Sequence, residues 1–227
     1  MKWKLLPPML LCMIIASAQK PEFTSLNSAL NNPTLITSLN LKGQNLSSLP
    51  ESIGQLTNLE RLDLSGNKLT SLPAALFTLK KLKYLNLTAN KLTSVPATIS
   101  NLKKLEELDI SFNPIGSLPK EIGKLAHLSR LSAAKNNLKT LPDEMAQMSS
   151  IKILDFTYNQ FITIPKAITG MKNLKALDIG YNKSLANYPD EIKNLEALKL
   201  LNIKNTKLSK ILVEELKRLL PGCLIML

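Results

Sequence analysis

The chain has 227 residues, of which 44% are hydrophobic and only 4% aromatic, and its formal net charge is +12. This hydrophobic content excludes a generally disordered protein, and the length allows one or two domains with a sizeable core. Because leucine is by far the commonest apolar residue, the composition indicates a repetitive core.

Residues 1–18 are predicted to be a secretory signal peptide. The basic start MKWK is followed by the apolar run LLPPMLLCMIIA and by small residues that suit cleavage after Ala18. The run is short for a membrane span, and Pro7 and Pro8 would break a helix within it, although an uncleaved anchor is the alternative. The sequence therefore predicts a secreted or periplasmic protein with no transmembrane segment after cleavage. The short leader and the lack of cysteine-rich caps suggest a bacterial source.

Residues 19–33 are predicted to form an N-terminal helical cap. In the stretch FTSLNSALNNP, Thr24 or Ser25 can cap a short helix that carries Leu26 and Leu30 on one face.

Residues 34–211 are predicted to hold eight repeats of about 23 residues. An asparagine recurs every 23 residues, with leucine-like residues at offsets −8, −5, −3, +2 and +5 and a proline shortly afterwards. These asparagines are Asn67, Asn90, Asn113, Asn136, Asn159 and Asn182. The terminal repeats carry Gln44 and Thr206 instead, as expected of atypical end units in a stacked array.

The motif L-x-x-L-x-L-x-x-N, followed by LP and xxIGxL as in LPESIGQL and LPKEIGKL, resembles the leucine-rich repeat. The length of 23 residues resembles the subclass found in Ras-suppressor-type, plant intracellular Ras-group-related and many bacterial proteins. The resemblance covers nearly all of the chain after the leader. It implies an α/β fold: a right-handed horseshoe-shaped solenoid with a parallel sheet on the concave face and short helices or 3-10 turns on the convex face.

Elementary energetics agree with a stacked array. The alternating apolar residues of LERLDLS favour a strand with one buried face. One repeat alone would order its residues at about 1.5 kcal/mol each, whereas each buried apolar side chain returns only about 1.5–3 kcal/mol. A repeat is therefore expected to fold only when neighbours cover both of its open sides. The asparagine is expected to bond backbone groups where the chain leaves the strand. The proline is expected to begin the convex segment, where its fixed φ suits the first turn of a short helix.

Residues 212–227 are predicted to form a C-terminal cap. The stretch VEELKRLLPGCLIML reads as a helix, a turn at Pro221-Gly222 and a final strand. After cleavage, Cys223 would be the only cysteine, so no internal disulfide is expected. It is interpreted as a small buried hydrophobe, with a reactive thiol or an intermolecular bridge as the alternative.

The candidate binding residues are those that the core pattern leaves free. Counted from the first leucine of a repeat, positions 3, 5 and 7 point outward from the sheet, and position 8 forms a column at its edge. From the fourth to the seventh repeat this column is aromatic or cationic beside an apolar strip at position 3, which suits an interface hot spot. The rings could instead only shield the asparagines, and the position 5 acids could only bond their neighbours. The candidates are Tyr84, Phe112, Arg130, Lys135, Ile153, Asp155, Tyr158, Asp178, Tyr181 and Leu200.

The sequence gives no support to catalysis. His127 is the only histidine, and no cysteine or histidine cluster, serine triad or glycine-rich phosphate loop is present, so no enzyme, metal or cofactor is predicted. The outward positions 3, 5 and 7 hold five acids and four bases, so the basic excess lies elsewhere, and nucleic-acid binding is not predicted.

The predicted function is therefore binding: a monomeric module that presents a rigid concave surface to another protein. One alternative is a glycan- or cell-envelope-binding protein that uses Phe112, Tyr158 and Tyr181 as stacking platforms. Another is a structural envelope component with no specific ligand.

Overall fold

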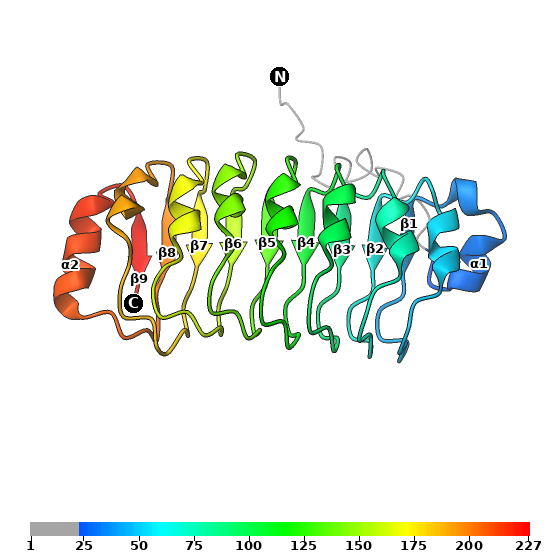
Figure 1. Ribbon diagram of the computed structural model, residues 1–227, viewed down its shortest axis with the longest axis horizontal. Coiled ribbons are helices and arrows are strands. Elements are labelled where there is room, and N and C mark those ends of the chain that lie inside the picture. Colours follow the sequence, from blue (N-terminus) through cyan, green and yellow to red (C-terminus); the bar gives the residue numbers. More distant parts are fainter. Residues whose placement is uncertain (1–22) are drawn as a thin grey trace, which may run out of the picture.

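The computed structural model describes residues 23–227, so the predicted signal peptide at 1–18 lies outside the described residues. Figure 1 shows a single parallel sheet whose strands follow one another in chain order, with 3-10 segments in a second row over one face and helices α1 and α2 at opposite ends. The strands are β1 (Ser38–Asn40), β2 (Arg61–Asp63), β3 (Tyr84–Asn86), β4 (Glu107–Asp109), β5 (Arg130–Ser132), β6 (Ile153–Asp155), β7 (Ala176–Asp178), β8 (Leu200–Asn202) and β9 (Leu224–Met226). The predicted solenoid with a parallel sheet and short 3-10 segments is confirmed.

The helical segments are short because each one only returns the chain to the next strand. The α-helices are α1 (Leu26–Leu30) and α2 (Lys210–Leu219). The 3-10 segments are η1 (Pro33–Leu35), η2 (Glu51–Gln55), η3 (Ala74–Thr78), η4 (Ala97–Asn101), η5 (Lys120–Lys124), η6 (Asp143–Gln147), η7 (Lys166–Gly170) and η8 (Asp190–Asn194).

The repeated proline lies immediately before its 3-10 segment, one residue ahead of the first turn that its fixed φ was expected to suit. Pro119, for example, has φ −72° and ψ 145°, so its φ suits entry into η5 while its ψ keeps it extended. Its carbonyl accepts the first turn's hydrogen bond from the Ile122 N–H at 3.0 Å. The proline therefore acts as an N-cap residue.

A continuous leucine core runs through the array. Neighbouring strands pair without a shift in register, so that Leu62 of β2 lies opposite Leu85 of β3. The central residue of each of the first eight strands is a leucine that is at most 1% exposed: Leu39, Leu62, Leu85, Leu108, Leu131, Leu154, Leu177 and Leu201. Because each repeat buries these side chains against the next one, the core extends from α1 to α2.

The asparagines line the interior where the chain turns out of each strand. The Nδ2 group of Asn136 donates to the carbonyl oxygens of Ile110 at 3.1 Å and of Ala133 at 3.1 Å. Its Oδ1 accepts from the Ile115 N–H in the preceding repeat at 3.1 Å. The other five asparagines make the same kinds of bonds, so each one ties a repeat to its predecessor.

Both ends of the sheet are covered. At the N-terminal end, Ser25 caps α1, and the carbonyl oxygen of Phe23 accepts from the Asn40 N–H of β1 at 2.7 Å. At the C-terminal end, Ser209 caps α2, and β9 pairs in parallel with β8. Helix α2 begins at Lys210, slightly before the C-terminal cap predicted at 212–227.

Tyr188 joins the last complete repeat to α2. The seventh repeat carries one extra residue, and Tyr188 takes the place of a core leucine with only 8% of its surface exposed. Its hydroxyl donates to Glu215 Oε2 at 2.9 Å and lies 3.2 Å from the Leu212 carbonyl oxygen. Burial first, and then the bond to Glu215, raise the pKa of Tyr188 to about 12.

We expect Tyr188→Phe to lower the free energy of unfolding by about 1–2 kcal/mol at neutral pH, because the bonds to α2 are lost. An unfolded tyrosine ionises near pH 10, roughly two units below Tyr188 in the fold. The stabilisation by Tyr188 should therefore be complete below pH 10 and decline as the pH rises towards 12. Urea unfolding of both proteins at a series of pH values measures this difference. A difference that stayed constant up to pH 12 would contradict the account.

Among the glycines of the 3-10 segments, Gly123 leaves the least room for a side chain. A Cβ atom added there would overlap the backbone carbonyl of Glu144 in the next segment. We expect Gly123→Ala to destabilise the protein by about 1–3 kcal/mol, because a backbone group cannot rotate away. Gly116→Ala is the matched control, since a Cβ there meets no heavy atom within 4 Å, and it should be neutral or mildly stabilising. Equal losses in urea unfolding would rule out the close contact as the cause.

Candidate partner-binding surface

Position 8 of every repeat has a left-handed backbone. The residues of this position-8 column, with φ between 51° and 68°, are Gly43, Gly66, Ala89, Phe112, Lys135, Tyr158, Tyr181 and Asn205. At this position the chain turns out of the strand, but the backbone N–H still donates a hydrogen bond to the next repeat. The Phe112 N–H, for example, donates to the Ala134 carbonyl oxygen at 2.8 Å. Glycine adopts this conformation freely, whereas a residue with a side chain is destabilised by about 1–2 kcal/mol.

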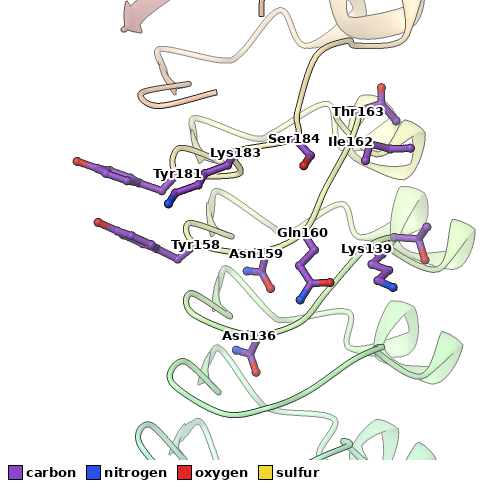
Figure 2. Close-up of a pocket in the computed structure, with 11 residues that line it drawn as sticks. Asn136, Lys139, Tyr158, Asn159, Gln160, Ile162, Thr163, Tyr181, Lys183 and Ser184 are labelled. Atoms are coloured by element: carbon purple, nitrogen blue, oxygen red, sulfur yellow. The ribbon is translucent and has the colours of Figure 1, made fainter. Parts of the chain in front are cut away.

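Four side chains of the column form one continuous stack. Lys135 Nζ lies 4.4 Å from the ring centroid of Phe112 and 5.1 Å from that of Tyr158. The rings of Tyr158 and Tyr181 are stacked with centroids 4.2 Å apart and planes 11° apart. Figure 2 shows both tyrosines extending side by side away from the ribbon. The stack is nevertheless open to solvent, since Phe112 is 49% and Tyr158 44% exposed.

The tyrosine hydroxyls are suited to hydrogen bonding. Loss of hydration, followed by the neighbouring phenol of Tyr181, raises the pKa of Tyr158 above its usual value. The Tyr158 hydroxyl therefore stays protonated at neutral pH and can donate to a partner. An aromatic body with a polar tip suits a protein interface, where one end is buried and the other stays wet.

A depression of about 850 Å³ lies between this tyrosine pair and the 3-10 segments. Figure 2 shows Ile162 on the side of the depression opposite the tyrosines, with Lys139 and Lys183 along it. Ile162 is 66% exposed, and no acidic residue lines the depression. Neither Ile162 nor the two lysines were predicted from the sequence. An isoleucine at a position where earlier repeats carry serine, threonine, glycine or lysine was the available signal.

The outward face of the sheet carries an apolar strip near the column. Ile153, Ala176 and Leu200 lie on neighbouring strands in register, and each is partly exposed. The strip continues into Leu224 of β9, which pairs with Leu200 and is 65% exposed. Leu224 was missed because β9 lies outside the repeat pattern.

The acids at position 5 have a structural use. Asp155 accepts from the Thr157 N–H at 3.0 Å, and Asp178 accepts from the Gly180 N–H at 3.2 Å. Asp178 also accepts from Asn202 Nδ2 at 2.9 Å. Burial is the main cause that raises the pKa of Asp178, and the neighbouring Asp155 adds to it. These bonds favour the interpretation that position 5 serves neighbouring backbone groups.

Tyr84 and Arg130 lie on the outward face of the sheet, where Arg130 is paired in register with Ile153 of the apolar strip. The guanidinium of Arg61 sits 3.7 Å from the Tyr84 ring centroid. Tyr84 and Arg130 line a small depression of about 220 Å³, with Glu107 of β4 between them in the register. Arg130 therefore adjoins the apolar strip through Ile153, whereas Tyr84 lies two strands before Arg130.

Three further features of residues 23–227 concern metal binding, the free thiol and membrane-spanning helices. Within residues 23–227, no group of three or more histidine, cysteine, aspartate or glutamate side chains could hold a metal ion. Cys223 is a free, partly buried thiol. Burial raises the pKa of this thiol, although the nearby Lys199 acts in the opposite direction. The raised pKa makes the thiol less reactive. No helix in these residues is both long and apolar enough to cross a membrane.

Comparison with known proteins assigns the repeats to a family. A family model described as leucine rich repeat matches residues 34–92 and 57–115, and a model described as leucine-rich repeat region matches residues 108–223. The chain belongs to the leucine-rich repeat proteins. A search of proteins with curated descriptions found no significant match.

Solved structures support the fold. A leucine-rich repeat protein of Leptospira interrogans has 21% sequence identity and a TM-score of 0.51, with 92% of this chain and 100% of that chain covered. Internalin C2 of Listeria monocytogenes has 22% identity and a TM-score of 0.70, with 80% of this chain and 77% of that chain covered. Both similarities concern the solenoid, and family membership supports a role as a protein-interaction module.

Proposed function

We propose that this protein is a non-enzymatic, monomeric binding module that recognises another protein through its position-8 column, the adjoining depression and the apolar strip. The observation that carries the proposal is that bulky side chains occupy backbone positions that favour glycine. Phe112, Lys135, Tyr158 and Tyr181 occupy left-handed positions that the first repeats fill with glycine or alanine. Strained positions with bulky, exposed side chains are characteristic of binding and catalytic sites.

The chemistry of the surface indicates what the partner presents. The exposed Ile162 and the tyrosine pair would receive an apolar side chain, and a preformed solenoid requires little ordering when a partner docks. Lys139 and Lys183 line the same depression without an acidic neighbour in its wall, so they would pair with acidic residues of the partner. The expected partner surface is therefore an apolar protrusion flanked by carboxylates.

The glycan alternative receives less support from the ring geometry. A sugar stacks on an open ring face, but Tyr158 has Tyr181 on one face and Lys135 on the other. Neither face of Tyr158 is therefore left open for a sugar, which favours a protein partner at this ring. The predicted leader with cleavage after Ala18 supports placing the module in the periplasm or outside the cell.

Affinity capture from envelope and medium fractions of the source organism tests the proposal. Each fraction is used untreated, after protease digestion and after periodate oxidation of sugars. We expect one retained protein that disappears after protease treatment and survives periodate. Capture that is lost only after periodate, and that the Tyr158→Ala/Tyr181→Ala variant also loses, would establish the glycan alternative. No specific capture would leave the structural envelope role. A Leu35→Ala/Ile211→Ala variant should retain the same partner, because it removes exposed apolar side chains at the two ends only.

A further inference from the structure

A second column lies at the opposite edge of the sheet, where each strand begins. It consists of the residue after the first leucine of each repeat, here called position 2. Its members are Thr37, Glu60, Lys83, Glu106, Ser129, Lys152, Lys175 and Lys199. Consecutive members are joined through the backbone: the Lys175 N–H donates to the Lys152 carbonyl oxygen, and the Lys199 N–H to that of Lys175, each at 2.8 Å.

The two halves of this column differ in charge. In the N-terminal half the signs alternate, and Lys83 pairs with Glu60 at 3.1 Å. In the C-terminal half, Lys152, Lys175 and Lys199 follow one another, and all three are exposed. Within residues 23–227, none of these three lies within 4.0 Å of an acidic oxygen. Neighbouring strands are about 4.8 Å apart, so the row places like charges close together, and none of the three is held in an ion pair.

A polar depression of about 600 Å³ adjoins this lysine row. Lys152 and Lys175 line it together with the hydroxyls of Ser149 and Ser150 and the amide of Asn173. Asn173 Nδ2 donates to the Ser149 carbonyl oxygen at 2.8 Å, which fixes the amide in place. The serine hydroxyls both donate and accept hydrogen bonds, so cations and hydroxyl-binding groups lie side by side.

The same wall disfavours a nucleic acid as the ligand. Its remaining charged or titratable residues are Glu106 and His127, and no phenylalanine, tyrosine or tryptophan lines it. Single-stranded nucleic acids depend on aromatic platforms for base stacking. The carboxylate of Glu106 can accept a hydrogen bond from a sugar hydroxyl, which a polysaccharide offers on every unit.

We propose that the lysine row and this depression bind a linear anionic polysaccharide. The three lysines would pair with acidic groups on successive sugar units, while Ser149, Ser150 and Glu106 would bond sugar hydroxyls. The row follows the long axis of the solenoid, which fits a linear chain of charges better than a single headgroup. This site lies at the opposite end of the strands from the position-8 column, so it leaves the proposed protein-binding surface free.

The test compares two triple variants of the full chain that carry the same net charge. Lys152→Gln/Lys175→Gln/Lys199→Gln removes the row, whereas the control Lys68→Gln/Lys91→Gln/Lys207→Gln removes three exposed lysines from the other edge. The probes are heparin, polygalacturonate, a single-stranded oligonucleotide and vesicles with anionic lipid, at about 0.15 M salt. We expect both polysaccharides to bind, the row variant to lose at least about tenfold in affinity and to show a weaker salt dependence, and the control to change less than about twofold.

Three outcomes would overturn the proposal. Equal losses of polysaccharide affinity in both triple variants would show that net charge alone causes the binding. Binding of the vesicles or the oligonucleotide as tightly as the polysaccharides would assign the row to another ligand. If neither polysaccharide bound at this salt concentration, the lysine row would not be a polysaccharide-binding site. The Tyr158→Ala/Tyr181→Ala variant should bind the polysaccharides normally, which separates this test from that of the protein-binding surface.

Discussion

Replacing Asn136 with alanine is expected to lower the free energy of unfolding by about 2–4 kcal/mol. The side chain is buried in the middle of the array, and its Oδ1 is the acceptor for the Ile115 N–H. Alanine leaves this buried N–H without a partner, and it also removes the donor to the carbonyl oxygens of Ile110 and Ala133. Those carbonyls keep a bond from another asparagine, so the unpaired N–H is the main source of the loss.

The matched control for this prediction is the next residue, Asn137, which is exposed. Its side-chain contact is a 3.3 Å bond from Gln160 Nε2, so Asn137→Ala should change stability by less than about 0.5 kcal/mol. Urea unfolding followed by circular dichroism gives both values. A loss below 1 kcal/mol for Asn136→Ala would mean that water or a backbone shift replaces the asparagine.

Replacing both Tyr158 and Tyr181 with alanine is expected to weaken binding of the captured partner by about 100-fold or more. Truncation of a hot-spot residue costs about 2 kcal/mol or more, and each 1.4 kcal/mol corresponds to a tenfold change in the dissociation constant. The two rings stack on each other, so the single variants should not sum to the double variant. The change should appear mainly in the dissociation rate.

Surface plasmon resonance with the purified partner measures these constants. The control variant Leu35→Ala/Ile211→Ala should differ from the natural chain by less than about twofold, as expected for residues outside the interface. If the double tyrosine variant bound within about threefold of the natural chain, the proposed surface would not be the binding site.

Much of the fold was predictable because the 23-residue period determines which side of each strand is buried and how neighbouring strands pair. The repeated leucines set the buried side of each strand, and an unchanged period keeps neighbouring strands in register, as for Leu62 and Leu85. The asparagine could be interpreted from its donors and acceptors alone. The exact position of the proline relative to its 3-10 segment could not be predicted, because its fixed φ suits both the first helical residue and the extended residue before it.

The geometry of the candidate site was only partly accessible from the sequence. The left-handed backbone at position 8 had a readable signal, since Gly43, Gly66 and Ala89 occupy that position in the first three repeats. The stacking of Tyr158 on Tyr181 depends on side-chain rotamers, which a repeat pattern does not specify. The exposure of Leu224 depends on how the last strand pairs with the sheet. The depression beside Ile162 depends on how the loops of neighbouring repeats meet.

The most direct test of the account is the stability of a Tyr158→Gly/Tyr181→Gly variant. Glycine should relieve about 1–2 kcal/mol of backbone strain at each site, while loss of the ring stack should cost about 0.5–1.5 kcal/mol. If the tyrosines are held for recognition, the free energy of unfolding should stay within about 1 kcal/mol of the natural chain or rise above it. A fall of about 2 kcal/mol or more would show that the rings are needed to hold the repeats together, and the position-8 column would then be packing and not a binding surface.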